Sequence, residues 1–182
     1  SRGLGDVYKR QIINALNSGA DVFMADFEDS TSPTWKNIMD GQVNLLDANL
    51  RDLEFVDPKN EKTYSLNPES NTSLFVRPRG LHLDDKNVLL NGAPVSGAFL
   101  DFALYTFHNA KLRLENGIGT YFYIPKLENS SESQLWDDIF SFSEDELSLP
   151  RGTLRATVLL ETISASFEID EILYSLKEHS LG

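Results

Sequence analysis

ADVFMADFEDS (residues 20–30) begins as a continuous apolar run and ends in an acidic cluster. The run, from Val22 to Ala25, follows a glycine turn and shows no polar alternation. Apolar runs of this length are typical of strands buried on both faces, as in a parallel sheet covered by helices. The stretch therefore predicts a buried parallel strand, with carboxylates directly after its C-terminal end.

Three more segments repeat this pattern of an apolar strand that leads into charged residues: SLFVRPRG (73–80), TYFYIPKLE (120–128) and TLRATVLLETIS (153–164). Helical spacing of apolar residues follows each of the four strands, at 34–50, 97–117, 131–147 and 165–180. Strands and helices that alternate in this way indicate a parallel sheet with helices outside it. The predicted fold class is α/β with about four strand–helix units, either a doubly wound sheet or part of a (β/α)8 TIM barrel.

Motifs and length favour the partial barrel. No GxGxxG or Walker A motif follows the first strand, which weakens the nucleotide-binding doubly wound folds. A complete (β/α)8 barrel takes about 250 residues, whereas this chain has 182. The polar segment 51–72 predicts a small β-hairpin excursion, and 81–97 predicts a surface hairpin that turns at Asn91-Gly92.

Helix boundaries can also be predicted from local signals. Residues 12–18 have the character of a helix end, and Ser32 is the expected N-cap of the next helix. Ser131 is expected to begin a capping box. Residues 1–11 lack a clear amphipathic period, so we expect them to be non-native or disordered, with an incomplete barrel domain over 12–182.

Composition excludes several classes of function. The net charge is −12 and the pI is about 4.6, which argues against nucleic acid or an anionic membrane as a partner, since both need a basic surface. The chain has no cysteine, so disulfides, a thiol nucleophile and thiolate metal sites are excluded. Its apolar runs are far shorter than the ~20 residues of a membrane helix.

The ends of the four predicted strands carry ionisable residues of both signs. They are Asp26, Glu28, Asp29, Arg77, Arg79, Lys126, Glu128 and Glu161. Because ligands bind beyond the C-terminal ends of strands in parallel α/β folds, we expect these residues to converge on one face. Carboxylates bind Mg²⁺, and arginine can grip a carboxylate and stabilise an oxyanion. The set suggests a metal site for a small α-keto or α-aldehydo acid.

Each of these residues also has a purely structural interpretation. Acidic residues after a strand often cap the following helix, and an arginine there often forms a structural salt bridge. Glu161 is harder to explain in this way, because it interrupts an apolar run and a buried carboxylate needs a partner. The three histidines have no ligand spacing, so we expect them to serve surface or helix packing: His82, His108 and His179.

Four stretches in order resemble malate synthase of the shorter, A-type branch. They are INALNSGADVFMADFEDSTSPTW (13–35), LFVRPRGLHL (74–83), FYIPKLE (122–128) and ATVLLETISASFEIDEILYSLKEHS (156–180). The resemblance runs from about Ile12 to Gly182 and covers roughly a third of a family member. It implies a (β/α)8 barrel that condenses acetyl-CoA with glyoxylate and hydrolyses the thioester to give malate and CoA.

The resemblance also implies a function for individual residues. Arg77 matches the catalytic arginine, which polarises glyoxylate and stabilises the enolate of acetyl-CoA. Glu161 matches a ligand of Mg²⁺, the implied cofactor. Asp26 and Glu28 match the acidic motif behind the metal, and Ser30 is a candidate contact for coenzyme A.

Two family residues fall outside the sequence. By the resemblance, the second metal-ligand aspartate would follow Gly182, and the aspartate that takes the methyl proton of acetyl-CoA would lie much further on. We therefore expect the polypeptide alone to have no malate synthase activity. The expected compartment is the bacterial cytoplasm, or a peroxisome or glyoxysome in a eukaryote.

Two alternatives stay open at this point. Acyl-CoA lyases of the citrate lyase β-subunit or malyl-CoA lyase type share a strand-end arginine, a PK-x-E-like segment and a metal-binding glutamate, although the strings MADFEDS and VRPRG favour malate synthase. The other alternative is a non-catalytic α/β domain that binds a small acid or a protein partner.

Overall fold

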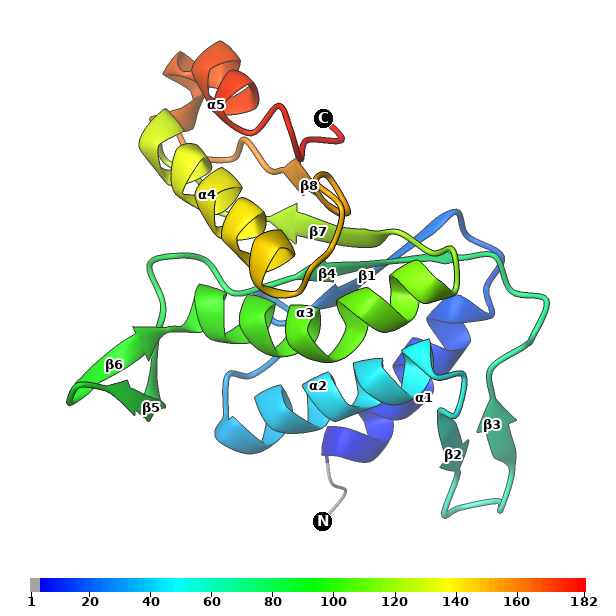
Figure 1. The fold of residues 1–182 in the computed structure, drawn as a ribbon. Helices are drawn as coiled ribbons and strands as arrows, with labels where there is room; N and C mark the ends of the chain where they lie inside the picture. Colours follow the sequence, from blue (N-terminus) through cyan, green and yellow to red (C-terminus); the bar gives the residue numbers. More distant parts are fainter. Residues whose placement is uncertain (1–3) are drawn as a thin grey trace.

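The chain forms a single parallel sheet with helices packed outside it (Figure 1). The computed structural model describes the backbone of residues 4–182 and the side chains of residues 9–182. The sheet contains β1 (Val22–Asp26), β4 (Ser73–Arg77), β7 (Thr120–Ile124) and β8 (Leu154–Val158), in the spatial order β1-β4-β7-β8. All neighbours are parallel and follow chain order, as in a (β/α)8 barrel. The sheet does not close, so the predicted partial barrel is confirmed.

In the described part of the chain, five helices lie outside this sheet. They are α1 (Leu4–Leu16), α2 (Trp35–Asn49), α3 (Gly97–Glu115), α4 (Ser130–Glu146) and α5 (Ile169–Ser175). Neighbouring helices pack side by side: α1 with α2, α2 with α3, and α4 with α5 (Figure 1). Large aromatic side chains fill the space between α3, α4 and the sheet, including Phe102, Tyr105, Phe122, Trp136 and Phe140. The core therefore lies between the helices and one face of the sheet.

The strands are less buried than the apolar runs predicted. In β7, Phe122 and Ile124 are fully buried toward the helices, whereas Tyr121 and Tyr123 between them are only half-buried. Tyr121 stacks on Phe75 of β4 at 4.9 Å between ring centroids. These residues lie on the face that would become the barrel interior, which stays uncovered because the sheet is open. In β1, the strand for which burial on both faces was predicted, Val22 is 50% exposed and Phe23 and Met24 are half-buried, so that prediction is wrong.

The last residues of the chain extend the sheet beyond β8. Ala156 donates its N–H to the carbonyl of His179 at 2.8 Å, and its own carbonyl accepts the N–H of Leu181 at 2.7 Å. Ser180 pairs with Ala156 in a parallel bridge. Residues 179–182 therefore run along β8 as the next strand of a barrel would.

Both hairpins that the sequence predicted are present. β2 (Glu54–Val56) pairs with β3 (Thr63–Ser65), and β5 (Asp84–Leu90) pairs with β6 (Ala93–Ser96). The second hairpin turns at Asn91 and Gly92, whose φ angles are 53° and 82°. Two successive positive φ angles match the strand twist of a tight hairpin, and asparagine followed by glycine tolerates them best.

Local helix boundaries differ from the prediction at both expected caps. Thr34, not Ser32, caps α2, and its hydroxyl accepts the N–H of Asn37 at 3.2 Å. Asn129, not Ser131, caps α4 by accepting the N–H of Glu132. In each case the capping residue has an extended backbone, which presents its side-chain oxygen to the first helical turn.

The helix predicted over 165–180 is broken into shorter pieces. A 3-10 turn, η1 (Ala165–Phe167), precedes α5, and the chain leaves helical geometry after Ser175. At the other end of the chain, α1 begins at Leu4, within the segment 1–11 that was expected to be non-native or disordered; residues 1–3 lie outside the described residues. The expectation about the origin of 1–11 stays a prediction.

Within the described part of the chain, no helix combines the length and apolar character needed to cross a membrane.

Candidate active site

The loop after β1 is folded around the carboxylate of Asp26. Its oxygens accept the N–H of Glu28 at 2.8 Å, the N–H of Ser30 at 3.2 Å and the hydroxyl of Ser30 at 2.9 Å. Aspartate commonly organises a turn by accepting backbone N–H groups a few residues ahead. This turn carries Glu28 and Asp29 toward the end of the neighbouring strand, β4.

Arg77 ends β4 directly beside Asp26, its partner in the ladder. Its Nη2 donates to Asp29 at 2.8 Å and contacts Glu28, and its Nη1 lies 3.7 Å from Asp26. The side chain is 9% exposed. Burial lowers the pKa of the guanidinium, but the three carboxylates outweigh burial and raise it. Nε of Arg77 is buried without a hydrogen-bond partner among the described residues, so it can donate to a ligand.

Glu28 interacts electrostatically with charged residues at the ends of β4, β7 and β8. Burial raises the pKa of its carboxyl above the ordinary value of 4.5; Arg77 opposes this, and the negative charges of Asp29 and Glu161 add to it. Lys126 also acts on Glu28 through its charge. The end of β4 and the loops after β1, β7 and β8 therefore contribute charged residues to one site.

The raised pKa of Glu28 predicts a specific pH dependence of stability. A carboxyl whose pKa is higher in the folded protein contributes stability below its unfolded pKa, and this contribution is lost as pH rises through the folded value. We expect Glu28→Gln to remove this loss, so the variant should gain stability relative to the parent as the pH rises above the ordinary glutamate pKa of 4.5. Urea unfolding as a function of pH measures the difference, and a difference independent of pH would contradict the prediction.

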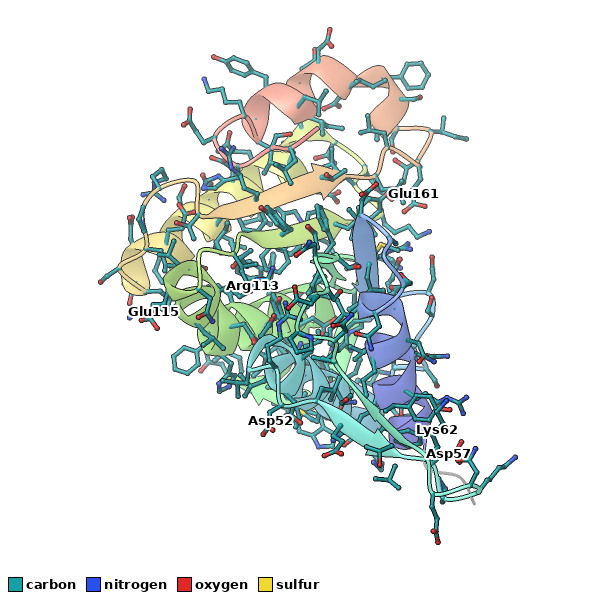
Figure 2. The ribbon with its side chains drawn as sticks, turned by 90° about the vertical axis from the view of Figure 1, so that its right-hand side faces the viewer. Asp52, Asp57, Lys62, Arg113, Glu115 and Glu161 are labelled. Carbon is teal, nitrogen blue, oxygen red and sulfur yellow. The ribbon has the colours of Figure 1, made fainter. Side chains whose placement is uncertain are left out.

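Glu161 lies in the loop after β8, at one end of the sheet (Figure 2). One carboxylate oxygen accepts the N–H of Lys126 at 3.1 Å, and the other lies 3.3 Å from Nζ of the same lysine. The side chain of Glu161 is 26% exposed. Glu161 is nevertheless an exposed residue, so the burial expected from the apolar run is wrong, because the loop after β8 lies at the surface; the carboxylate is held there by the ammonium and the backbone N–H of Lys126.

Two of the eight strand-end residues are not part of this site. Arg79 is 3% exposed and turns away to bind Asp101 of α3 and Asp85 of β5, at 2.8 Å and 3.0 Å. Glu128 is exposed, and its backbone N–H donates to Glu132 in the first turn of α4. The expectation that all eight converge is therefore wrong for these two, because Arg79 is bound by Asp101 and Asp85 and Glu128 lies exposed at the start of α4.

Ser30, the candidate contact for coenzyme A, binds Asp26 with both its hydroxyl and its N–H. It also lines a hollow of about 590 Å³ between α1 and β1, together with Asp26 and Thr31. The contact with coenzyme A stays a prediction. Of the three histidines, His82 and His108 are exposed, while His179 is buried against Asp137 and Glu144 at 2.7 Å and 3.2 Å.

The site residues suit a divalent cation. Among the residues whose side chains are described, four carboxylates, from Asp26, Glu28, Asp29 and Glu161, act on two cations, Arg77 and Lys126. This leaves an excess of negative charge when all are ionised. The described residues contain no cluster of three ready-made metal ligands. Mg²⁺, however, needs only one or two protein carboxylates and completes its shell with water and substrate.

Comparison with known proteins identifies the family. The family model described as "Malate synthase, TIM barrel domain" matches residues 73–182. The chain is 53% identical to malate synthase of Myxococcus xanthus and 51% identical to glyoxysomal malate synthase of Candida tropicalis, in each case over 98% of this chain and 32% of the relative. It is 50% identical to a bifunctional glyoxylate cycle protein of Caenorhabditis elegans, over 18% of that protein.

The chain thus spans about a third or less of the length of these relatives. The matched region covers 98% of this chain, so it includes most of residues 1–11, where the sequence analysis had seen no resemblance. The TIM-barrel family model agrees with the parallel strand order of the sheet. The chain belongs to the malate synthase family.

Proposed function

We propose that this chain forms part of the active site of a malate synthase, which condenses acetyl-CoA with glyoxylate and hydrolyses the thioester to malate and CoA. The observation that carries the proposal is the guanidinium of Arg77, with its unpartnered Nε, at the edge of a carboxylate cluster that includes Glu161. A buried arginine with a free donor suits a substrate with an anionic oxygen.

In this proposal Arg77 donates to the oxygen of glyoxylate and to the enolate oxygen that forms on acetyl-CoA. Fixed donors that face a developing negative charge lower the barrier, because they need no reorganisation during the reaction. Glu28 and Asp29 hold the guanidinium in place while Nε stays available. Glu28 and Asp29 therefore orient the guanidinium, and its Nε is left to bind the substrate.

Glu161 is the proposed ligand of Mg²⁺, with Asp26 and Glu28 behind it. The bound ion would polarise the aldehyde carbonyl of glyoxylate as a Lewis acid. The excess negative charge of the cluster and the raised pKa of Glu28 support a cation at this place.

Some relatives are named glyoxysomal and others are bacterial. We propose the glyoxysome as the compartment in a eukaryotic source and the cytoplasm in a bacterial one.

Release of CoA tests this function. A family-length protein that contains this chain should release free thiol from acetyl-CoA only when both glyoxylate and Mg²⁺ are present. An acyl-CoA lyase would instead cleave malyl-CoA or citramalyl-CoA reversibly without hydrolysing acetyl-CoA. Lyase activity without glyoxylate-dependent thiol release would overturn the proposal, and so would a protein that is inactive in both assays.

A further inference from the structure

Lys126 holds both oxygens of the Glu161 carboxylate. Its backbone N–H donates to Oε1 at 3.1 Å, and its ammonium donates to Oε2 at 3.3 Å. The two side chains are 34% and 26% exposed, so solvent can reach them. A single residue thus determines where the proposed metal ligand points.

The backbone of Lys126 is arranged for this grip. Its φ is +57°, a left-handed conformation that costs a residue with a side chain about 1 kcal/mol and persists only where neighbouring contacts enforce it. Those contacts flank Lys126 on both sides. Before it, the carbonyl of Ile124 accepts the N–H of Leu159 at 2.9 Å. After it, the carbonyl of Leu127 accepts the hydroxyl of Thr162 at 2.6 Å. The loops after β7 and β8 are therefore joined around the pair of Lys126 and Glu161.

The ammonium of Lys126 faces several acidic groups. The hydrogen bond to Glu161 is the main reason that the pKa of this lysine is raised, and the charges of Glu161, Glu28 and Asp29 contribute further. Arg77 is the other cation in contact with this acidic cluster, and its guanidinium is already held by Glu28 and Asp29. Among the described residues, Lys126 is thus the cation that forms a salt bridge with the carboxylate of Glu161.

We infer that Lys126 is a positioning residue. In the metal-free protein its ammonium pairs with the carboxylate of Glu161, and it withdraws when a divalent cation binds to that carboxylate. The inference rests on the proposed function, because it takes Glu161 as the metal ligand. The backbone N–H keeps one oxygen oriented throughout, while the flexible ammonium releases the other. Lysine and metal ion therefore bind the same carboxylate alternately.

Competition of this kind predicts a gain of affinity when the lysine is removed. A like charge a few ångströms from a divalent cation is repulsive even where solvent screens it, so its loss should tighten binding by about tenfold. If Lys126 served only to hold Glu161 in place, its removal would have the opposite effect. The carboxylate of Glu161 would become mobile, and the affinity for the metal ion would fall. The direction of the change therefore separates the two explanations.

The experiment is a titration of the full chain with Mn²⁺, in which electron paramagnetic resonance measures the free ion. Lys126→Met removes the ammonium and keeps the backbone N–H, and it should bind Mn²⁺ about tenfold more tightly than the parent. Lys62→Met is the matched control: it removes the same charge from the region of the β2–β3 hairpin, at the opposite end of the molecule from Glu161 (Figure 2). It should bind Mn²⁺ as the parent does.

A second variant separates this inference from the proposed function. If Glu161→Gln abolishes Mn²⁺ binding while Lys126→Met leaves it unchanged or weaker, the metal site stands and the competition is refuted. If Glu161→Gln leaves Mn²⁺ binding intact, the proposed metal site fails, and the inference fails with it.

A readout without activity completes the test. In nitrogen-15 NMR, an ammonium held by a carboxylate exchanges its protons slowly and stays visible. The Lys126 signal should be present in the metal-free chain, and it should be lost in Glu161→Gln and on addition of Mg²⁺ to the parent. A signal that persists at saturating Mg²⁺ would refute withdrawal of the lysine.

Discussion

Asp101→Asn is expected to lower the free energy of unfolding by about 3 kcal/mol, at the lower end of the range for a broken buried ion pair. Asp101 is fully buried, and its carboxylate accepts three hydrogen bonds from Arg79. The donors are Nε at 2.9 Å, Nη2 at 2.8 Å and the backbone N–H at 3.0 Å. Asparagine keeps one acceptor but not the charge, so the guanidinium stays buried with only Asp85 as an ionic partner.

Urea unfolding followed by tryptophan fluorescence measures this loss, since Trp136 is buried in the core beside α3. The matched control is Asp145→Asn, because Asp145 is 70% exposed and pairs with Arg151 at the surface. Surface pairs contribute up to about 1 kcal/mol, so the control should unfold close to the parent. Equal unfolding midpoints for Asp101→Asn and Asp145→Asn would contradict the structural assignment of Arg79.

The two arginines of VRPRG show where sequence reasoning ends. Arg77 and Arg79 lie two residues apart after the same strand, with the same side chain and the same local chemistry. Only the tertiary structure separates them: Arg77 meets the acidic loop after β1, and Arg79 meets Asp101 on α3. Nothing within the motif records which carboxylate each will reach, so the sequence predicted both for the site.

The fold was easier to predict than the site because its signals are local. The apolar run at 22–25, bounded by a glycine turn and an acidic cluster, and the Asn91-Gly92 turn are local signals, and the strand and the hairpin turn that they predict are both present, although the strand is not buried on both faces. The grip of Lys126 on Glu161 spans 35 residues and depends on a positive φ at a lysine. That conformation is imposed by contacts around it, so no pattern in IPKLE could have revealed it.

The predictions of the two N-cap residues were wrong for a similar reason. Ser32 and Ser131 carry suitable hydroxyls, but Thr34 and Asn129 lie at the positions where the chain changes from extended to helical. A serine and a threonine two residues apart have nearly the same preference for capping a helix. The residue at which the backbone changes from extended to helical becomes the cap, which lies two residues from the predicted one in each case without changing the element.

Arg77→Lys should lower kcat by about a hundredfold or more in a family-length malate synthase that contains this chain, the usual cost of losing one oxyanion donor. The planar guanidinium spreads its donors in a fork, so Nη2 can hold Asp29 and contact Glu28 while Nε remains free. A lysine concentrates its three donors on one nitrogen. In this acidic site it would pair with Glu28 and Asp29 and leave no donor aimed at the substrate oxygen.

Steady-state release of CoA at saturating glyoxylate and Mg²⁺ measures this effect, and circular dichroism shows whether the variant is folded. Arg151→Lys is the matched control, since Arg151 lies before β8, at the opposite end of the strand from Glu161, and pairs with Asp145 at the surface. It should retain the kcat of the parent. A folded Arg77→Lys enzyme with kcat within about twofold of the parent would refute the proposed function of the guanidinium, because a positive charge alone would then suffice where the proposal requires a fork of donors.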